Sequence, residues 1–302
     1  MNLSKRIQNS NNPRLSVVII FYNMRREAAR TLYSLGVRYQ REIAEEAYEV
    51  IAIDNGSSEP LDEDWVKSFG KNFKYIYFDA NTPSPCQALN YGVQMARGEL
   101  VTICIDGARI LSPNILNYSI KASAIFDKPF VYALGMHIGS KPQNFLAEEN
   151  YTREGEDQLI ASTRWEEDGY ELFNMYCVAL SSGQGFFSAL MESKCFALRR
   201  SMYLDMDGLD ENFSSPGGGL TNLDFFFRAG EIKNISPVML LGEVTSHQFH
   251  GGAATNVARK DHPWKQMAEE YKKIRKKEYQ PVFMPPYYFG GLHARCIRLL
   301  TL

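Results

Sequence analysis

The sequence predicts an α/β fold with a mostly parallel central sheet. Three apolar runs of strand length, Leu15 to Phe21, Tyr48 to Ile53 and Leu100 to Ile105, are each followed by turn-forming residues. Continuous β-branched runs are typical of strands buried on both faces. Because helical patterns alternate with these strands, right-handed crossovers are expected to place helices on both faces of the sheet.

The remaining elements of the first 112 residues follow in order. A helical pattern after the first strand extends to about Gly36, and a short strand covers Lys74 to Phe78. A helix is expected from Cys86 to Arg97, ending before a glycine. Ser112-Pro113 is typical of the cap and first residue of a further helix.

Composition indicates an ordinary globular protein. The 302 residues carry a net charge of -2, with 23% charged and 45% hydrophobic residues, and give no nucleic-acid footprint. Five cysteines without a CxxC pair, including Cys104 inside a buried strand, favour free thiols in the cytoplasm. No apolar run approaches the roughly 18 residues of a spanning helix. The Asn-rich segment 1–13 is predicted to be a disordered tail.

Acids follow two of the predicted strands at comparable positions. Asp54 ends the second apolar run and Asp106 ends the third. Open α/β sheets bind ligands beyond the carboxyl ends of their strands, so both acids are candidate ligand-binding groups. The alternative is that each acid caps its own loop. A dinucleotide fold is disfavoured because no GxGxxG follows the first strand.

Several motifs resemble those of family 2 glycosyltransferases with the GT-A fold. SVVIIFYN, IDNGSS and ALNYGVQMARGELVTICIDGA resemble the successive nucleotide-binding motifs. Downstream, ALRRSMYLDMDGLDENF, GGGLTNLDFFFRAGE and SHQFHGG resemble the acceptor-side segment, the start of the catalytic helix and a late histidine segment. The resemblance implies a GT-A-like, Rossmann-type sandwich over residues 14–255. Its nucleotide-sugar-binding half is 14–112, its acceptor-binding half is 113–255, and 256–302 forms a C-terminal helix and Pro/aromatic tail.

The resemblance also implies a nucleotide-sugar donor at the carboxyl edge of the sheet. Tyr22 falls where relatives stack on the base, and Asp54 where they accept a hydrogen bond from base or ribose, which suits a UDP- or dTDP-sugar. A core aromatic and a turn acid are the respective alternatives. The residues expected to bind the donor are Phe21, Tyr22, Asn23, Asp54, Asn81, Asn90, Asp106, Gly107, Ala108 and Arg109.

Asp106 corresponds to the first acid of the family's metal-binding DxD motif, but Ala108 replaces the second acid. Carboxylate and phosphate oxygens suit Mn²⁺ or Mg²⁺. His247 and His250 are the expected additional ligands, with one of them as a structural hydrogen-bonding group as the alternative. In a metal-free alternative, Arg109 or His250 neutralises the diphosphate directly.

The catalytic base is the second departure from the family pattern. An inverting transferase needs a carboxylate that takes the proton of the acceptor hydroxyl. Relatives place it in a Glu-Asp pair at a helix start, where this chain has Thr221-Asn222. Asp224 is the nearest carboxylate, and a helix N-terminus favours its charged form, although a helix-start charge without chemistry is the alternative. Glu192 is the second candidate, followed by the Asp210-Glu211 turn.

Two segments are candidates for the acceptor side. Aromatic residues between 135 and 190 form either an acceptor wall or part of the core: Trp165, Tyr170, Phe173, Tyr176, Phe186 and Phe187. The basic helix His262 to Lys277 is either a solvated face or a peripheral contact with anionic lipid headgroups.

The sequence therefore predicts transfer of a sugar, with inversion, to a hydroxyl of a saccharide or lipid-linked acceptor in polysaccharide or glycoconjugate biosynthesis. Two alternatives remain. A sugar-phosphate nucleotidyltransferase usually has a Gly-rich loop where this chain has FYNMRR, and a non-catalytic nucleotide- or glycan-binding relative would explain Ala108 and Asn222. Oligomeric state is left open.

Overall fold

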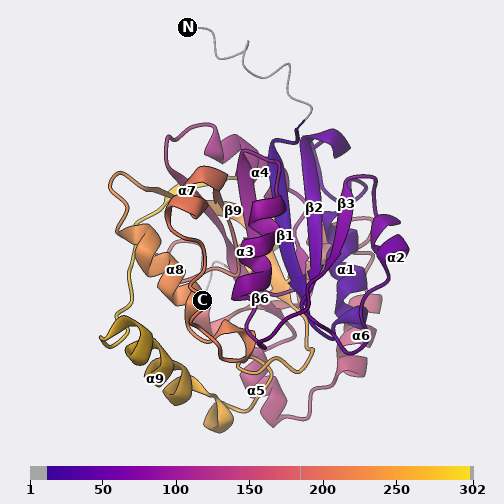
Figure 1. Ribbon diagram of the computed structural model, residues 1–302. Helices are drawn as coiled ribbons and strands as arrows, with labels where there is room; N and C mark the ends of the chain where they lie inside the picture. Colours follow the sequence, from indigo (N-terminus) through magenta and orange to yellow (C-terminus); the bar gives the residue numbers. More distant parts are fainter. Residues whose placement is uncertain (1–11, 184, 300–302) are drawn as a thin grey trace, which may run out of the picture.

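A computed structural model describes residues 12–183 and 185–299. The predicted disordered tail therefore lies outside the described residues, apart from Asn12 and Pro13. Within the described ranges the strands form one sheet in the order β10-β9-β6-β8-β4-β1-β2-β3, with β5 paired to β9 and β7 to β6 (Figure 1). The strands are β1 (Leu15–Phe21), β2 (Tyr48–Asp54), β3 (Phe73–Tyr77), β4 (Leu100–Cys104), β5 (Arg109–Leu111), β6 (Pro129–Ile138), β7 (Tyr176–Val178), β8 (Cys195–Arg199), β9 (Ser236–His247) and β10 (Tyr287–Gly290).

The predicted mostly parallel sheet is confirmed. β3, β2, β1 and β4 are parallel neighbours, as are β6, β9 and β10. β8 runs antiparallel to both β4 and β6 and joins the two parallel groups. The carboxyl ends of β1, β2 and β4 therefore meet at one edge, which is the arrangement of a GT-A-like α/β fold.

Helices cover both faces of the sheet, as the alternating pattern predicts (Figure 1). The α-helices are α1 (Arg25–Leu35), α2 (Glu63–Lys67), α3 (Cys86–Met95), α4 (Ile115–Ser123), α5 (Gln143–Glu148), α6 (Arg153–Ala161), α7 (Arg200–Asp205), α8 (Thr221–Gly230) and α9 (Trp264–Arg275). The 3-10 helices are η2 (Glu45–Ala47), η3 (Gly169–Met175), η4 (Leu180–Ser182), η5 (Pro216–Gly218), η6 (Arg259–Asp261) and η7 (Ala294–Leu299). Across the described part of the chain, no helix has both the length and the apolar character needed to cross a membrane.

Two hydrophobic clusters follow from the alternation of side chains along each strand. Val18 and Ile20 of β1 lie in the cluster that contains the buried residues of α3 and α8. Val17 and Ile19 lie in the other cluster, with the buried residues of α1 and α4. All four side chains are at most 5% exposed, so β1 is buried on both faces, as its continuous apolar sequence indicates.

The prediction that Ser112-Pro113 begins a helix is wrong by two residues. α4 begins at Ile115 with Asn114 as its N-cap, and the short strand β5 occupies Arg109–Leu111. The Ser112 hydroxyl instead donates to the carboxylate of Glu243 on β9, at 2.5 Å. The residues after Asp106 thus pair with a distant strand before the helix begins.

The aromatic residues considered for an acceptor wall belong mostly to the core. Trp165, Tyr170, Phe173, Tyr176 and Phe186 are all at most 6% exposed, whereas Phe187 is 61% exposed. The core alternative is therefore correct for five of the six.

Substitution of Gly92 tests how α3 packs on the sheet. A Cβ there would lie 2.4 Å from Cδ1 of Ile53 and 2.5 Å from Cγ1 of Val18. We expect Gly92→Ala to lower the free energy of unfolding by about 1–3 kcal/mol through overpacking, measured by denaturant unfolding. The exposed Gln94 on the same helix supplies the control, Gln94→Ala. Equal stability of the two variants would contradict this packing.

Candidate active site

A cavity of about 440 Å³ opens beyond the carboxyl ends of β1 and β4. Six of the ten residues predicted to bind the donor line it: Phe21, Tyr22, Asn23, Asp106, Gly107 and Arg109. His247 and His250 line the same cavity. Tyr22 is half exposed, so its ring is free to contact a ligand, unlike the core aromatic of the alternative interpretation. We refer to this space as the donor cavity, after the ligand that the family resemblance implies.

Four predicted donor residues do not line this cavity. Asp54 is fully buried, and its carboxylate accepts the backbone N–H groups of Ser57 at 2.8 Å and Leu61 at 3.0 Å. These contacts are those of an acid that closes its own loop. Its neighbour Asn55 does line the cavity, and its Oδ1 is buried without a hydrogen-bond partner among the described residues. Asn55 was not predicted from the sequence, because the family motif assigned donor binding to the neighbouring acid, Asp54.

The other three have different surroundings. Asn81 is exposed outside the cavity. Asn90 accepts from the Tyr203 hydroxyl at 2.7 Å and from the Leu209 N–H at 2.9 Å, so it holds the turn after α7. Ala108 is buried, and its N–H donates to Oδ1 of Asp106 at 3.0 Å. Ala108 thus acts on the acid through its backbone.

Gly107 explains how β4 can end so close to β1. A Cβ at this position would lie 2.2 Å from the Ile20 carbonyl oxygen and 2.5 Å from the ring of Phe21. Only glycine fits this approach without displacing the backbone. The missing side chain therefore keeps Asp106 next to the end of β1.

Asp106, His247 and His250 converge in the donor cavity, with ligand atoms within 4.8 Å of one another. Nε2 of His247 lies 3.0 Å from Oδ2 of Asp106 and 3.2 Å from Nε2 of His250. The pairing of β5 with β9 sets Arg109 opposite His247, which brings the two distant segments together. Burial lowers the pKa of His247 to about 4, so its ring is neutral at neutral pH.

The hydrogen bond on the far side of the ring fixes which nitrogen of His247 carries the proton. Its Nδ1 lies 2.6 Å from Oε1 of Gln143, whose Nε2 donates to the His247 carbonyl oxygen. Nδ1 therefore holds the single N–H, and Nε2 directs a lone pair at Asp106 and His250. Converging lone pairs of one carboxylate and two imidazoles suit a divalent cation, so these residues fit the metal that the fold family implies.

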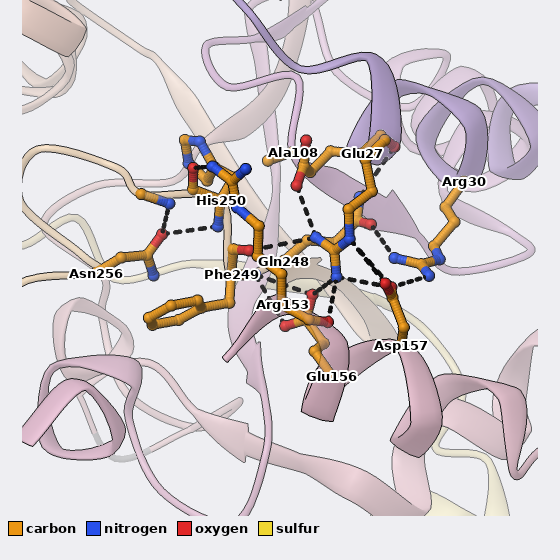
Figure 2. Close-up of polar contacts among 12 residues, drawn as sticks. Glu27, Arg30, Ala108, Arg153, Glu156, Asp157, Gln248, Phe249, His250 and Asn256 are labelled. Atoms are coloured by element: carbon orange, nitrogen blue, oxygen red, sulfur yellow. Dashed lines mark hydrogen bonds and ion pairs between the residues drawn. The ribbon is translucent and has the colours of Figure 1, made fainter. Parts of the chain in front are cut away.

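Residues of α6 and α1 hold the segment that carries His247 and His250. Both oxygens of the buried Glu156 carboxylate accept the Phe249 N–H, at 3.0 and 2.8 Å, and Arg153 donates to the His250 carbonyl oxygen (Figure 2). Burial raises the pKa of Glu156 to about 7, against the lowering effect of Phe249 N–H and Arg26. Asn256 accepts the N–H of His250 at 3.0 Å. His250 is therefore fixed through its backbone.

A second cavity of about 280 Å³ adjoins the donor cavity and contains Glu192. Arg109, Lys194 and Gly219 line both cavities. Oε2 of Glu192 accepts from Nζ of Lys194 at 2.8 Å and from Nδ2 of Asn222 at 2.8 Å. Although burial opposes it, Lys194 and Asn222 lower the pKa of Glu192, so this carboxylate is ionised at neutral pH. We refer to this space as the acceptor cavity, after the ligand expected beside the candidate base Glu192.

Asp224 lies away from both cavities. It is fully buried, and its two oxygens accept from Arg275 at 2.5 and 2.6 Å and from Arg228 at 2.8 Å. Both oxygens of this carboxylate are thus occupied by guanidinium groups, and neither the donor cavity nor the acceptor cavity includes it. Asp210 and Glu211 line a separate surface cavity. Of the four candidate bases, the geometry favours Glu192.

The fold and these adjoining cavities define a GT-A-like α/β protein with a polar site at the carboxyl edge of its sheet. Residues 16–117 match the family model described as glycosyl transferase family 2. This region is less than half of the chain, includes β1 to β5 and Asp106, and is similar to the glycosyltransferases of that family. The match disfavours the nucleotidyltransferase alternative.

Comparison with curated proteins and with solved structures adds little to this family match. No curated protein matches the sequence. Among solved structures, S. aureus TarS 1-349 has a TM-score of 0.48 at 16% identity, over 79% of this chain and 59% of that one. The same fragment in complex with UDP-GlcNAc has a TM-score of 0.46 at 17% identity, over 79% and 57%. This chain thus spans about three fifths of those fragments.

Metal binding tests the three-residue cluster. Mn²⁺ at 100 times its Kd is expected to stabilise the folded protein by about 2.7 kcal/mol, because the folded cluster binds it and the unfolded chain does not. We expect His247→Ala to remove this stabilisation in a thermal-shift titration. His262→Ala, outside the cluster, is the control and should respond as the wild type does. An equal Mn²⁺ response in His247→Ala would exclude the cluster as the site.

Proposed function

We propose that the protein transfers a sugar from a UDP- or dTDP-sugar to a hydroxyl of a saccharide or lipid-linked acceptor, with inversion. One observation carries the proposal: Arg109 and Lys194 line both cavities, between the Asp106 cluster on the donor side and Glu192 on the acceptor side. A diphosphate leaving group and an attacking hydroxyl would thus meet beside two cations.

On the donor side, Tyr22 is proposed to stack on the base and Asn55 to contact it through the unpartnered Oδ1. Asp106, His247 and His250 are proposed to hold Mn²⁺ or Mg²⁺, which would supply charge neutralisation to the diphosphate. Nε of Arg109 lies 3.4 Å from Oδ2 of Asp106, so the guanidinium adds a positive charge beside this carboxylate. Asp54, Asn81 and Asn90 are proposed to shape the surrounding loops.

On the acceptor side, Glu192 is proposed to accept the proton of the acceptor hydroxyl as its oxygen attacks the anomeric carbon. The bond between that carbon and the diphosphate oxygen breaks, and the nucleoside diphosphate leaves with the electron pair. Lys194 and Asn222 hold the base ionised and oriented. Asn222, at the position where relatives carry an acid, thus serves the base indirectly.

The proposed cellular location and biosynthetic role rest on the expectations from the sequence. A cytoplasmic location, with α9 as a peripheral membrane contact, is proposed on the scattered cysteines without a CxxC pair and on the basic residues in the last turn of that helix. A role in polysaccharide or glycoconjugate biosynthesis is proposed on the family alone.

Donor turnover tests the proposal. With Mn²⁺, the wild type is expected to release UDP or dTDP from at least one sugar nucleotide in a panel. Asp106→Ala should reduce this release at least a hundredfold, because the proposed cluster of Asp106, His247 and His250 loses its carboxylate. Arg164→Ala, whose exposed side chain lies outside both cavities, is the control. A wild type that turns over no donor would favour the non-catalytic alternative.

A pair of isosteric variants identifies the base. Glu192→Gln is expected to abolish transfer while UDP still raises the melting temperature, since only the proton acceptor is lost. Asp224→Asn should instead lower the free energy of unfolding by about 3–5 kcal/mol, because it breaks a buried ion pair. Loss of transfer in folded Asp224→Asn, with full activity in Glu192→Gln, would return the role to Asp224.

The pH profile gives an independent check on Glu192. Because its pKa is lowered and the base acts when ionised, activity should persist below the usual glutamate pKa and fall as the pH drops through the lowered value. Asn222→Ala removes a hydrogen bond to the charged form, which should move this acid limb to higher pH. An unchanged limb in Asn222→Ala would contradict the assignment.

A further inference from the structure

A glycine loop, residues 215–219, forms part of the wall between the two cavities. Gly217 and Pro216 line the donor cavity, and Gly219 lines both. Gly217, Gly218 and Gly219 all have positive φ, at 70°, 82° and 54°. Three successive residues in this region are available to glycine alone without strain, so the loop has many competing conformations and needs to be held.

Glu270 of α9 holds the start of this loop. Its Oε1 accepts the Ser214 N–H at 2.8 Å, the Ser214 hydroxyl at 3.0 Å and the Ser215 N–H at 3.0 Å. Its Oε2 is buried and lies 2.8 Å from the position that a Cβ of Gly219 would occupy. The carboxylate therefore binds one end of the loop and packs against the other.

α9 is itself fixed to the body of the protein. Arg275 near its end binds Asp224 of α8, and also Asp210 at 2.8 Å. Met267 and Tyr271 of α9 are at most 7% exposed. Figure 1 shows α9 beside α8 at one edge of the molecule. Glu270 thus projects from a rigid support.

The loop leads directly into the residues that orient the base. α8 begins at Thr221, two residues after Gly219, and its next residue, Asn222, donates to Glu192. A shift of the loop would move the first turn of α8 and with it the Asn222 amide. A displacement of about 1 Å at such a position can cost a hundredfold in rate.

We propose that Glu270 is a positioning residue for the transfer step: by holding Ser214 and Ser215 it fixes the glycine loop and, through the start of α8, the amide of Asn222 on Glu192. The inference rests on the proposed function. It gives Glu270 of α9 a role in the reaction although this side chain touches no reacting atom.

Three substitutions of Glu270 test this. Glu270→Ala removes the acceptor oxygen and Glu270→Asp withdraws it by one methylene, so both are expected to lower kcat about tenfold or more and to raise the acceptor KM. Glu270→Gln keeps an acceptor oxygen at the same reach and should restore kcat to within about threefold of the wild type. The UDP Kd should change less than kcat does, because Pro216 and Gly217 line the donor cavity but the groups proposed to hold the nucleotide, Tyr22, Asn55 and the Asp106 cluster, lie outside the loop.

Glu269→Ala, an exposed neighbour on the same helix, is the matched control and should retain wild-type kinetics. Wild-type kcat in Glu270→Ala and Glu270→Asp would overturn the inference. So would a parallel loss of UDP affinity, melting temperature and kcat in all three variants, since that marks general destabilisation. Failure of the proposed function has a different signature: the wild type and Glu269→Ala would transfer no sugar, and the inference would fall with it.

Discussion

The pairing of β5 with β9 is the contact on which the site depends. It sets Arg109 opposite His247 in register, so that residues far apart in the sequence meet directly beyond the end of β4. The close approach of Gly107 to β1 leaves Asp106 at the edge of the donor cavity rather than inside the sheet. Without this antiparallel pair, one carboxylate would remain with no imidazole beside it.

In the metal site that we propose, this geometry supplies two imidazoles in place of the second acid of the family motif. Ala108 contributes a backbone N–H to Asp106, and the lone pairs come from His247 and His250. Gln143 fixes the tautomer of His247, and Glu156 and Asn256 fix the backbone around His250. A larger share of imidazole ligands favours Mn²⁺ over Mg²⁺, since Mg²⁺ prefers oxygen.

Two carboxylates, Asp224 and Glu192, differ in their partners and in their access to a cavity. Asp224 is bound by two arginines and joins α8 to α9, so its carboxylate has a structural role. Glu192 has one lysine and one amide as partners and faces a cavity. Position relative to the family motif pointed to Asp224, but a proton acceptor also needs access to a cavity, and of these two carboxylates Glu192 lines one and Asp224 does not.

Local hydrophobic patterns and turn residues were enough to predict the parallel strands, the helices on both faces and the acid at the end of β4. The motifs also pointed to His247 and His250. Which polar residues share a cavity depends instead on long-range packing: Asp54 binds its own loop while Asn55 lines the donor cavity. Such choices arise from contacts between distant segments, as between Glu270 and Ser214, and no local pattern encodes them.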